Sequence, residues 1–164
     1  MRKFFVFGIT LVLLFSCGNK ADTVQVDKMN TLEFDVQKLP KKSILNGGTR
    51  AILEPWLEFN ELDVAFDALY SVENYEELIL LIDEFLEKQN ALASSTYPEI
   101  FDNPQVKSRQ KVFKTYVLKV KATLEYRKDP MEATIEMVNA YNGMRDQLNV
   151  LVNSNLDTKM ILDE

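Results

Sequence analysis

The chain has no histidine and only one cysteine, Cys17, among its 164 residues. Histidine is the most common general base near neutral pH and the commonest transition-metal ligand in proteins. Its absence excludes Ser-His-Asp and Cys-His catalysis, zinc hydrolases and histidine-containing di-iron sites. A single cysteine also has no partner for a disulfide within the chain. These absences predict a protein that is not an enzyme.

Glycine is scarce too, with five residues in the whole chain. Gly47 and Gly48 are adjacent, but neither a Walker motif nor a dinucleotide-binding pattern surrounds them. Acidic side chains are plentiful, yet no stretch has the spacing of a calcium-binding loop. We therefore expect no metal site and no bound cofactor.

An apolar run near the amino terminus is too short to be a membrane span. It covers residues 4–15, is interrupted only by Gly8 and Thr10, and follows the basic pair Arg2 and Lys3. A helix that crosses a bilayer needs about 20 apolar residues. A short run behind a basic start is instead typical of a secretory signal peptide.

Cys17 stands just after this run. Leu14, Ser16 and Cys17 together resemble the lipobox of bacterial lipoproteins, in which a leucine three residues before the cysteine and a small residue directly before it mark the cleavage site. The resemblance implies cleavage between Ser16 and Cys17, a diacylglycerol thioether on Cys17 and a third acyl chain on the new amino terminus. The alternative is an ordinary signal peptide in which the cysteine is incidental.

Several acyl chains would hold the mature protein stably on a membrane, because each buried methylene contributes about 0.8 kcal/mol. In its amino terminus and overall plan the chain resembles small helical lipoproteins of Bacteroidota. This similarity implies a lipid-anchored place in the cell envelope, at the outer membrane, and leaves the periplasmic or surface face open. It carries no known activity with it.

The predicted organisation has three parts: a signal peptide at residues 1–16, a lipidated amino terminus and flexible tether at 17–48, and a helical domain at 49–164. The tether is expected because this segment is polar, with only scattered apolar residues. Fully extended, it could lift the domain on the order of 100 Å from the bilayer. The Asn-Gly-Gly sequence at 46–48 predicts a turn or hinge just before the folded part.

Apolar residues at helical spacing predict four helices from residue 54 onward. They are expected at residues 54–71, 74–92, 103–128, and from 129 through at least 151. The residues predicted to cap the last three are Asn74, Asn103 and Asp129. Short connections favour antiparallel neighbours, so the predicted fold is all-α, an antiparallel up-down four-helix bundle.

Charge is distributed unevenly between the helices. Residues 51–90 hold eleven acids against one base, whereas residues 104–128 hold eight bases against one acid. The simpler interpretation is that the two faces complement each other across the bundle. In the alternative, the basic strip is a docking surface for an acidic partner, a lipid headgroup or an anionic glycan. The candidate residues for partner binding are Lys107, Lys111, Lys114 and Lys121.

Four residues interrupt the apolar face of the last predicted helix: Tyr141, Asn142, Gly143 and Arg145. A glycine inside a helix costs about 1 kcal/mol relative to alanine, so Gly143 suggests a close helix crossing or a notch. We expect Arg145 to pair with an acid of the first or second helix. A notch joined by Trp56, Tyr116 and Tyr141 could line a small pocket.

These features predict a membrane-anchored, non-enzymatic envelope lipoprotein whose helical bundle binds another envelope component through a helix face. The alternative is a carrier or sensor of a small apolar or anionic ligand in the bundle interior. Without the signal peptide the formal charge is near −8, which repels nucleic acids and anionic lipids and leaves the anchoring to the attached lipid. The sequence sets neither the specific partner nor the oligomeric state.

Overall fold

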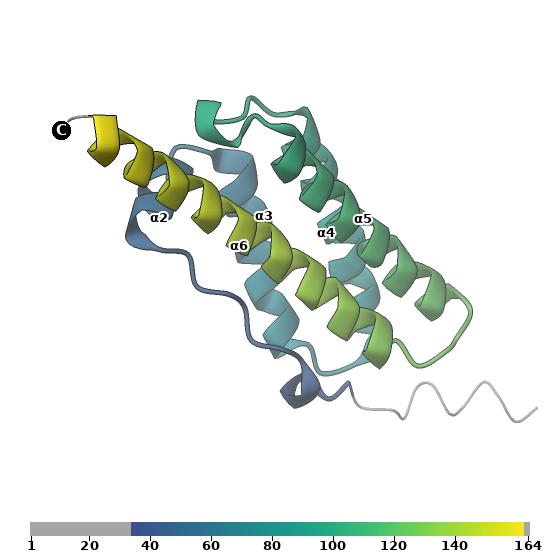
Figure 1. Cartoon of the computed structure of the whole chain (residues 1–164). Coiled ribbons are helices and arrows are strands. Elements are labelled where there is room, and N and C mark those ends of the chain that lie inside the picture. The colour runs from purple at the N-terminus through teal and green to yellow at the C-terminus, as the bar shows by residue number, and fades with distance from the viewer. Residues whose placement is uncertain (1–33, 163–164) are drawn as a thin grey trace, which may run out of the picture. The chain divides into compact units, whose positions relative to one another are not determined.

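The computed structural model of the chain describes residues 34–162, with side chains through residue 155. All secondary structure in this part is helical (Figure 1), which confirms the predicted all-α class. The five α-helices are α2 (Gly47–Leu53), α3 (Leu57–Ala68), α4 (Tyr75–Ser94), α5 (Pro104–Glu125) and α6 (Met131–Leu162). Three short 3-10 helices are η1 (Val36–Lys38), η2 (Leu69–Ser71) and η3 (Glu99–Phe101). The predicted signal peptide, with Ser16, and the lipidation site at Cys17 lie outside the described residues.

The predicted caps of the last three helices are confirmed. The Asn74 side chain accepts a hydrogen bond from the backbone N–H of Glu77 at 2.9 Å. Asn103 accepts from two backbone N–H groups in the first turn of α5, each at 3.0 Å. Asp129 accepts from the N–H of Met131 at 2.9 Å. Each cap satisfies N–H groups that have no partner within their own helix.

The turn or hinge predicted at residues 46–48 is wrong, because these residues begin helix α2. The Asn46 side chain accepts a hydrogen bond from the backbone N–H of Thr49 at 2.7 Å and caps the helix. Neither Gly47 nor Gly48 has a positive φ, so the local backbone is ordinary helix. Helix α2 packs against α6.

Helices that follow one another in the chain pack side by side. Helix α3 contacts α4, α4 contacts α5, and α5 contacts α6. The same order is visible in Figure 1, where α6 also passes beside α3. Side chains join the first and last of these helices directly, since the ring of Phe66 on α3 stacks on that of Tyr141 on α6 at a centroid separation of 3.9 Å.

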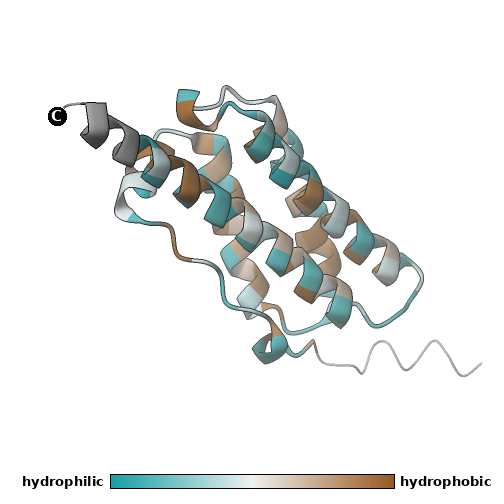
Figure 2. Cartoon of the chain, viewed as in Figure 1, coloured by the Kyte–Doolittle hydropathy of each residue, from teal (hydrophilic) through white to brown (hydrophobic). Residues whose placement is uncertain are grey.

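Four aromatic rings form the centre of the core, one from each of the helices α3 to α6. They belong to Phe66, Phe85, Phe113 and Tyr141, and all four are fully buried. The centroids of contacting rings lie 3.9 to 6.3 Å apart. Phe66, Phe85 and Phe113 are apolar residues at the predicted helical spacing, and Tyr141, which interrupts the apolar face of the last helix in the sequence, is buried with them. Figure 2 shows the same amphipathic pattern as hydrophilic and hydrophobic residues that alternate along each helix.

The apolar run at residues 78–82 of α4 is only partly buried. Helix α4 does pack against two neighbours, α3 and α5. Within the run, however, Leu80 is 72% exposed and Ile79 is 41% exposed. Two packed neighbours cover only part of a helix surface, so the remaining face meets solvent although its residues are apolar.

An extended segment, residues 34–46, which we call the strap, runs along the helices (Figure 1). Its first residue, Phe34, is buried and donates its backbone N–H to the carbonyl of Glu73 at 3.3 Å. Farther on, the hydroxyl of Tyr70 donates to the carbonyl of Pro40 at 2.8 Å. Residues 34–48 are the described part of the predicted flexible tether, and they differ from that prediction: the strap is docked on the helices, and Gly47 and Gly48 belong to α2.

Alanine at Gly143 is expected to raise the free energy of unfolding by about 0.5–1 kcal/mol, because alanine is favoured over glycine inside a helix. The added Cβ would lie 3.7 Å from Nη1 of Arg109, which is an ordinary contact with a flexible side chain. Urea denaturation checks the change. In the control, Gly48→Ala, the Cβ would lie 3.2 Å from Cγ1 of Val152, so the gain should be smaller or absent. A loss of stability in Gly143→Ala would mean that α5 and α6 approach each other at Gly143 too closely to admit a Cβ.

Candidate functional site

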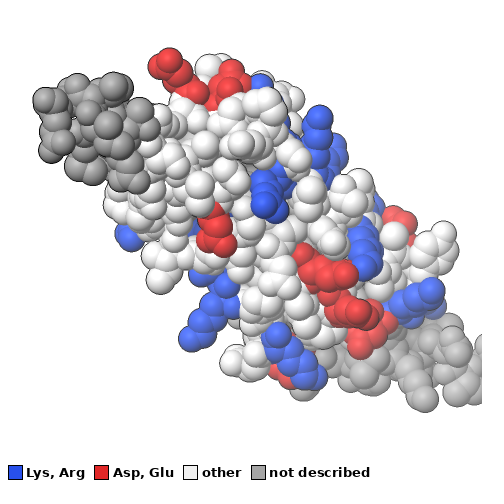
Figure 3. All heavy atoms as spheres, in the orientation of Figure 1, with Lys and Arg blue, Asp and Glu red and all other residues white. Residues whose placement is uncertain are grey.

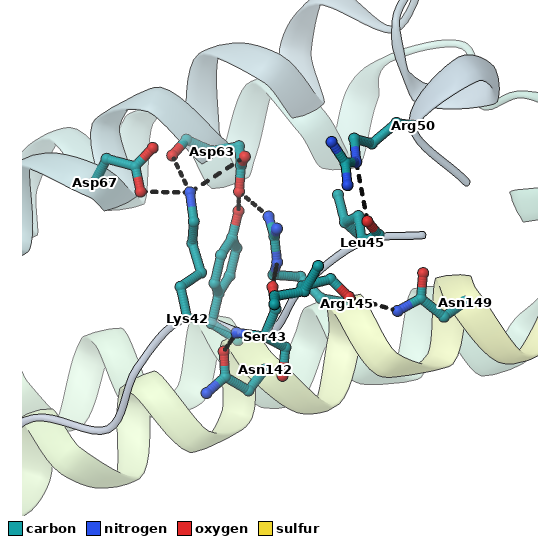
Figure 4. Close-up of polar contacts among 11 residues, drawn as sticks. Lys42, Ser43, Leu45, Arg50, Asp63, Asp67, Asn142, Arg145 and Asn149 are labelled. Atoms are coloured by element: carbon teal, nitrogen blue, oxygen red, sulfur yellow. Dashed lines mark hydrogen bonds and ion pairs between the residues drawn. The ribbon is translucent and has the colours of Figure 1, made fainter. Parts of the chain in front are cut away.

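Two asparagines of α6 hold the strap through its main chain (Figure 4). Asn142 accepts a hydrogen bond from the N–H of Ser43 at 2.8 Å and donates to the carbonyl two residues earlier at 2.9 Å. Asn149 accepts from the N–H of Asn46 at 3.0 Å and donates to the carbonyl two residues earlier at 2.9 Å. Each side-chain amide therefore bridges one N–H and one C=O of the strap.

The spacing of the two asparagines matches that of the main-chain groups they bind. Asn142 and Asn149 are seven residues apart, which is nearly two helical turns and about 10.5 Å along α6. Ser43 and Asn46 are three residues apart, which in an extended chain is about 10 Å. The helix and the strap therefore present their hydrogen-bonding groups at the same interval.

Arg145 lies between the two asparagines on α6 and is 5% exposed. Its Nε donates to the carbonyl of Ser43 at 2.8 Å. Its Nη1 pairs with Oδ1 of Asp63 on α3. The predicted pairing of Arg145 with an acid of the first or second helix is thus confirmed, and this side chain joins α3, α6 and the strap.

Asp63 is the centre of this polar cluster. Its Oδ1 accepts a hydrogen bond from the Tyr141 hydroxyl at 2.7 Å, and its Oδ2 lies 3.3 Å from Nζ of Lys42 in the strap. Lys42 also pairs with Asp67, one turn farther along α3. Burial, reinforced by the Asp63 carboxylate, raises the pKa of Tyr141 well above its ordinary value. The phenol therefore keeps its proton and acts as a donor.

An open cleft of about 680 Å³ lies beside the cluster, between the strap, α2 and α3. Its lining is mixed: Leu45, Leu53 and Phe59 are buried apolar residues, whereas Glu54, Asp63 and the buried Arg145 add charge. Arg50 borders it and donates its Nε to the carbonyl of Leu45 at 2.9 Å. The volume is within the range of small-molecule sites.

The aromatic residues suggested for an interior pocket are not brought together. Trp56 stacks on Phe59 and Phe101, with centroid separations of 5.7 and 6.3 Å. Tyr141 instead belongs to the four-ring core described above and is fully buried. Tyr116 stands apart from both and has the ammonium of Lys119 above its ring.

The four candidate lysines form a stripe along α5, which we call the lysine stripe: Lys107, Lys111, Lys114 and Lys121. Their successive spacings of four, three and seven residues keep them on one side of the helix. Lys114 donates to the side chain of Asn90 at 2.7 Å, and Lys121 to that of Asp83 at 2.8 Å. Both partners are on α4, so this part of the stripe faces α4.

The lysine stripe is only partly neutralised by acids. Lys121 pairs with an acid of α4 as the complementary-charge interpretation predicts, and Lys107 pairs with Asp102 in the preceding loop. Lys111 is exposed and has no ion-pair partner among the residues that the structure describes. On the face of the molecule drawn in Figure 3, basic and acidic side chains are interspersed.

Between residues 34 and 162, no group of three or more acidic, histidine or cysteine side chains is placed to hold a metal ion. None of the helices in the same range combines the length and apolarity needed to cross a membrane. Comparisons of the chain with protein-family models, with curated proteins and with solved structures find no match.

Proposed function

We propose that the protein is a non-enzymatic lipoprotein of the cell envelope, anchored through lipid on Cys17, whose helical domain binds another envelope component. The observation that carries the proposal is the basic start, short apolar run and lipobox-like Leu14, Ser16 and Cys17. The lipid would be covalent and the only non-protein group. Outer-membrane attachment follows from the resemblance to lipoproteins of Bacteroidota, with the face left open.

The domain in this proposal is an antiparallel up-down bundle of α3, α4, α5 and α6. Contacts between helices that are consecutive in the chain support this topology, as does the short connection at residues 126–130 between α5 and α6. The stacking of Phe66 on Tyr141 supports closure of the bundle between its first and last helices. A bundle of this kind presents several outward helix faces to partners.

Membrane attachment should depend on Cys17. The wild-type protein is expected in the membrane fraction of its native host, with an intact mass equal to the chain from Cys17 onward plus acyl groups. Cys17→Ser should leave the protein uncleaved and unacylated, and Lys111→Ala is a control that should keep both lipid and location. Wild-type protein that is full-length and unacylated in the aqueous fraction would overturn the proposal.

The lysine stripe is the proposed docking face for an acidic partner. Lys111→Glu combined with Lys114→Glu should lower the recovery of a cross-linked partner about tenfold, because reversed rim charges slow association and oppose the complex. The matched control is Arg127→Glu with Lys128→Glu, which reverses two bases outside the stripe. Equal recovery from the two double variants would contradict docking at the stripe.

A second function, carriage of a small apolar or anionic ligand, is favoured by one observation. The open cleft of about 680 Å³ combines apolar residues with charged groups of both signs, including the guanidinium groups of Arg50 and of Arg145, which is paired with Asp63. A native mass spectrum of the membrane-extracted protein should then contain a bound small molecule. A spectrum free of such a molecule would count against this second function.

A further inference from the structure

The strap is recognised through its main chain more than through its side chains. Asn142, Asn149 and Arg145 contact backbone N–H and C=O groups of residues 41–46. The side chain of Ile44, in the middle of this segment, is 81% exposed and contributes little to binding. Contacts of this kind accept any residue that has an N–H and an extended backbone.

The surface beneath the strap carries polar groups as well as apolar ones. Its polar groups include the amides of Asn142 and Asn149 and the paired charges of Asp63 and Arg145. Such groups can bond to water when they are uncovered. Phe34, Leu39 and Leu45 are buried, so they and the residues they contact would lose apolar burial if the whole strap left.

Charge complementarity defines what else fits this surface. The strap carries Lys38, Lys41 and Lys42 and no acid after Asp35. Lys42 is held between two carboxylates of α3, those of Asp63 and Asp67. An occupant of the same place must therefore be basic at this position, and an acidic segment would be repelled.

We propose that the surface of α3 and α6 beneath residues 39–46, the strap groove, binds an extended basic segment of a partner protein in exchange for the strap. The segment needs a lysine, an apolar residue three positions later, and free N–H groups one and four positions after the lysine, as at Lys42, Leu45, Ser43 and Asn46. Proline is excluded from the two N–H positions. The strap groove is thus a second contact surface, separate from the lysine stripe, and this inference rests on the proposed interaction function.

A peptide-binding measurement on the full chain tests the exchange. Ser43→Pro removes the N–H that Asn142 accepts and loosens the chain's own strap. A labelled synthetic peptide of residues 38–46 should bind this variant saturably, and bind wild-type protein at least tenfold more weakly, because the intact strap competes at high effective concentration. Adding Asn142→Ala should weaken binding about tenfold, since two hydrogen bonds are lost.

The matched control is the same peptide with proline in place of the residue that corresponds to Ser43, which should not bind. Circular dichroism verifies that the Ser43→Pro variant is helical. No saturable binding of the unmodified peptide to the folded variant up to millimolar concentration would overturn the proposal. A doubled mass in native spectra of wild-type protein, reduced by Asn142→Ala, would assign the strap groove to a second copy and would also overturn it.

Hydrogen exchange on wild-type protein gives a test that does not depend on any variant. The amides of Ser43 and Asn46 should exchange at least a hundredfold faster than the amide of Phe113 in the core, because the strap opens locally. Equal exchange rates would mean that the strap leaves only on global unfolding, which excludes exchange with a partner. If the strap amides exchange as slowly as Phe113 while Cys17 is lipidated and the lysine stripe binds its partner, only the strap groove is excluded. If all three experiments fail, the proposed function is excluded as well.

Discussion

Replacing Phe66 with alanine is expected to lower the free energy of unfolding by about 3–5 kcal/mol, the usual cost of deleting a buried aromatic ring. Phe66 is fully buried and contacts four other rings, that of Tyr70 and those of Phe85, Phe113 and Tyr141 on the other long helices. The truncation would remove ring contacts between α3 and each of the other three long helices at once. Urea denaturation followed by circular dichroism measures the loss.

Val64→Ala is the matched control for this variant, because Val64 is on the same helix but is 71% exposed. It should change stability by less than about 0.5 kcal/mol. A loss below about 1 kcal/mol for Phe66→Ala would mean that the four rings do not meet as described. That outcome would remove the main support for closure between α3 and α6.

Replacing Arg145 with alanine should cost about 2–3 kcal/mol, because removing one member of a buried ion pair leaves the other without its partner. The loss stays below the upper end of such effects because Asp63 is 24% exposed and keeps Lys42 at 3.3 Å. The carbonyl of Ser43 also loses a donor. The strap should therefore exchange its amide hydrogens faster in this variant, which mass spectrometry of exchanged protein detects.

Arg109→Ala is the control of the same residue type, since Arg109 is exposed and has no ion-pair partner within residues 34–155. Its stability should differ from wild type by no more than about 0.5 kcal/mol. If the two arginine variants were equally stable, the pair between Arg145 and Asp63 would not fasten the strap. Unchanged rates of amide hydrogen exchange in the strap of Arg145→Ala would likewise mean that this ion pair does not hold the strap.

The long helices could be predicted because each shows apolar residues at helical spacing, and the starts of the last three are marked by caps such as Asn74 and Asn103. Helix α2 could not be predicted, because its seven residues are too few to show a helical repeat of apolar residues. Its Asn-Gly-Gly start is also a turn signal, and only the structure shows that Asn46 acts as a cap.

The candidate site was predicted only in part. The pairing of Arg145 with an acid of the first or second helix could be predicted from its place on an otherwise apolar helix face, because a buried charge needs an opposite charge, but the particular acid, Asp63, could not. The docking of the strap could not be predicted, because polar residues such as Lys42 and Ser43 dock through main-chain groups, and these do not affect the hydropathy of the sequence. One usable signal was present: Asn142 and Asn149 recur at a seven-residue interval on one side of a helix.

If Cys17 carries the proposed lipid, the docked strap limits how far the domain can travel from the membrane. Only residues 18–33 then separate the anchor from the fastened chain, and at about 3.5 Å per residue they reach roughly 55 Å, about half the distance allowed to the whole tether. Freeing residues 34–46 would add about 45 Å. A partner segment that displaced the whole strap, including Phe34, would therefore also increase the distance over which the domain can move from the anchor.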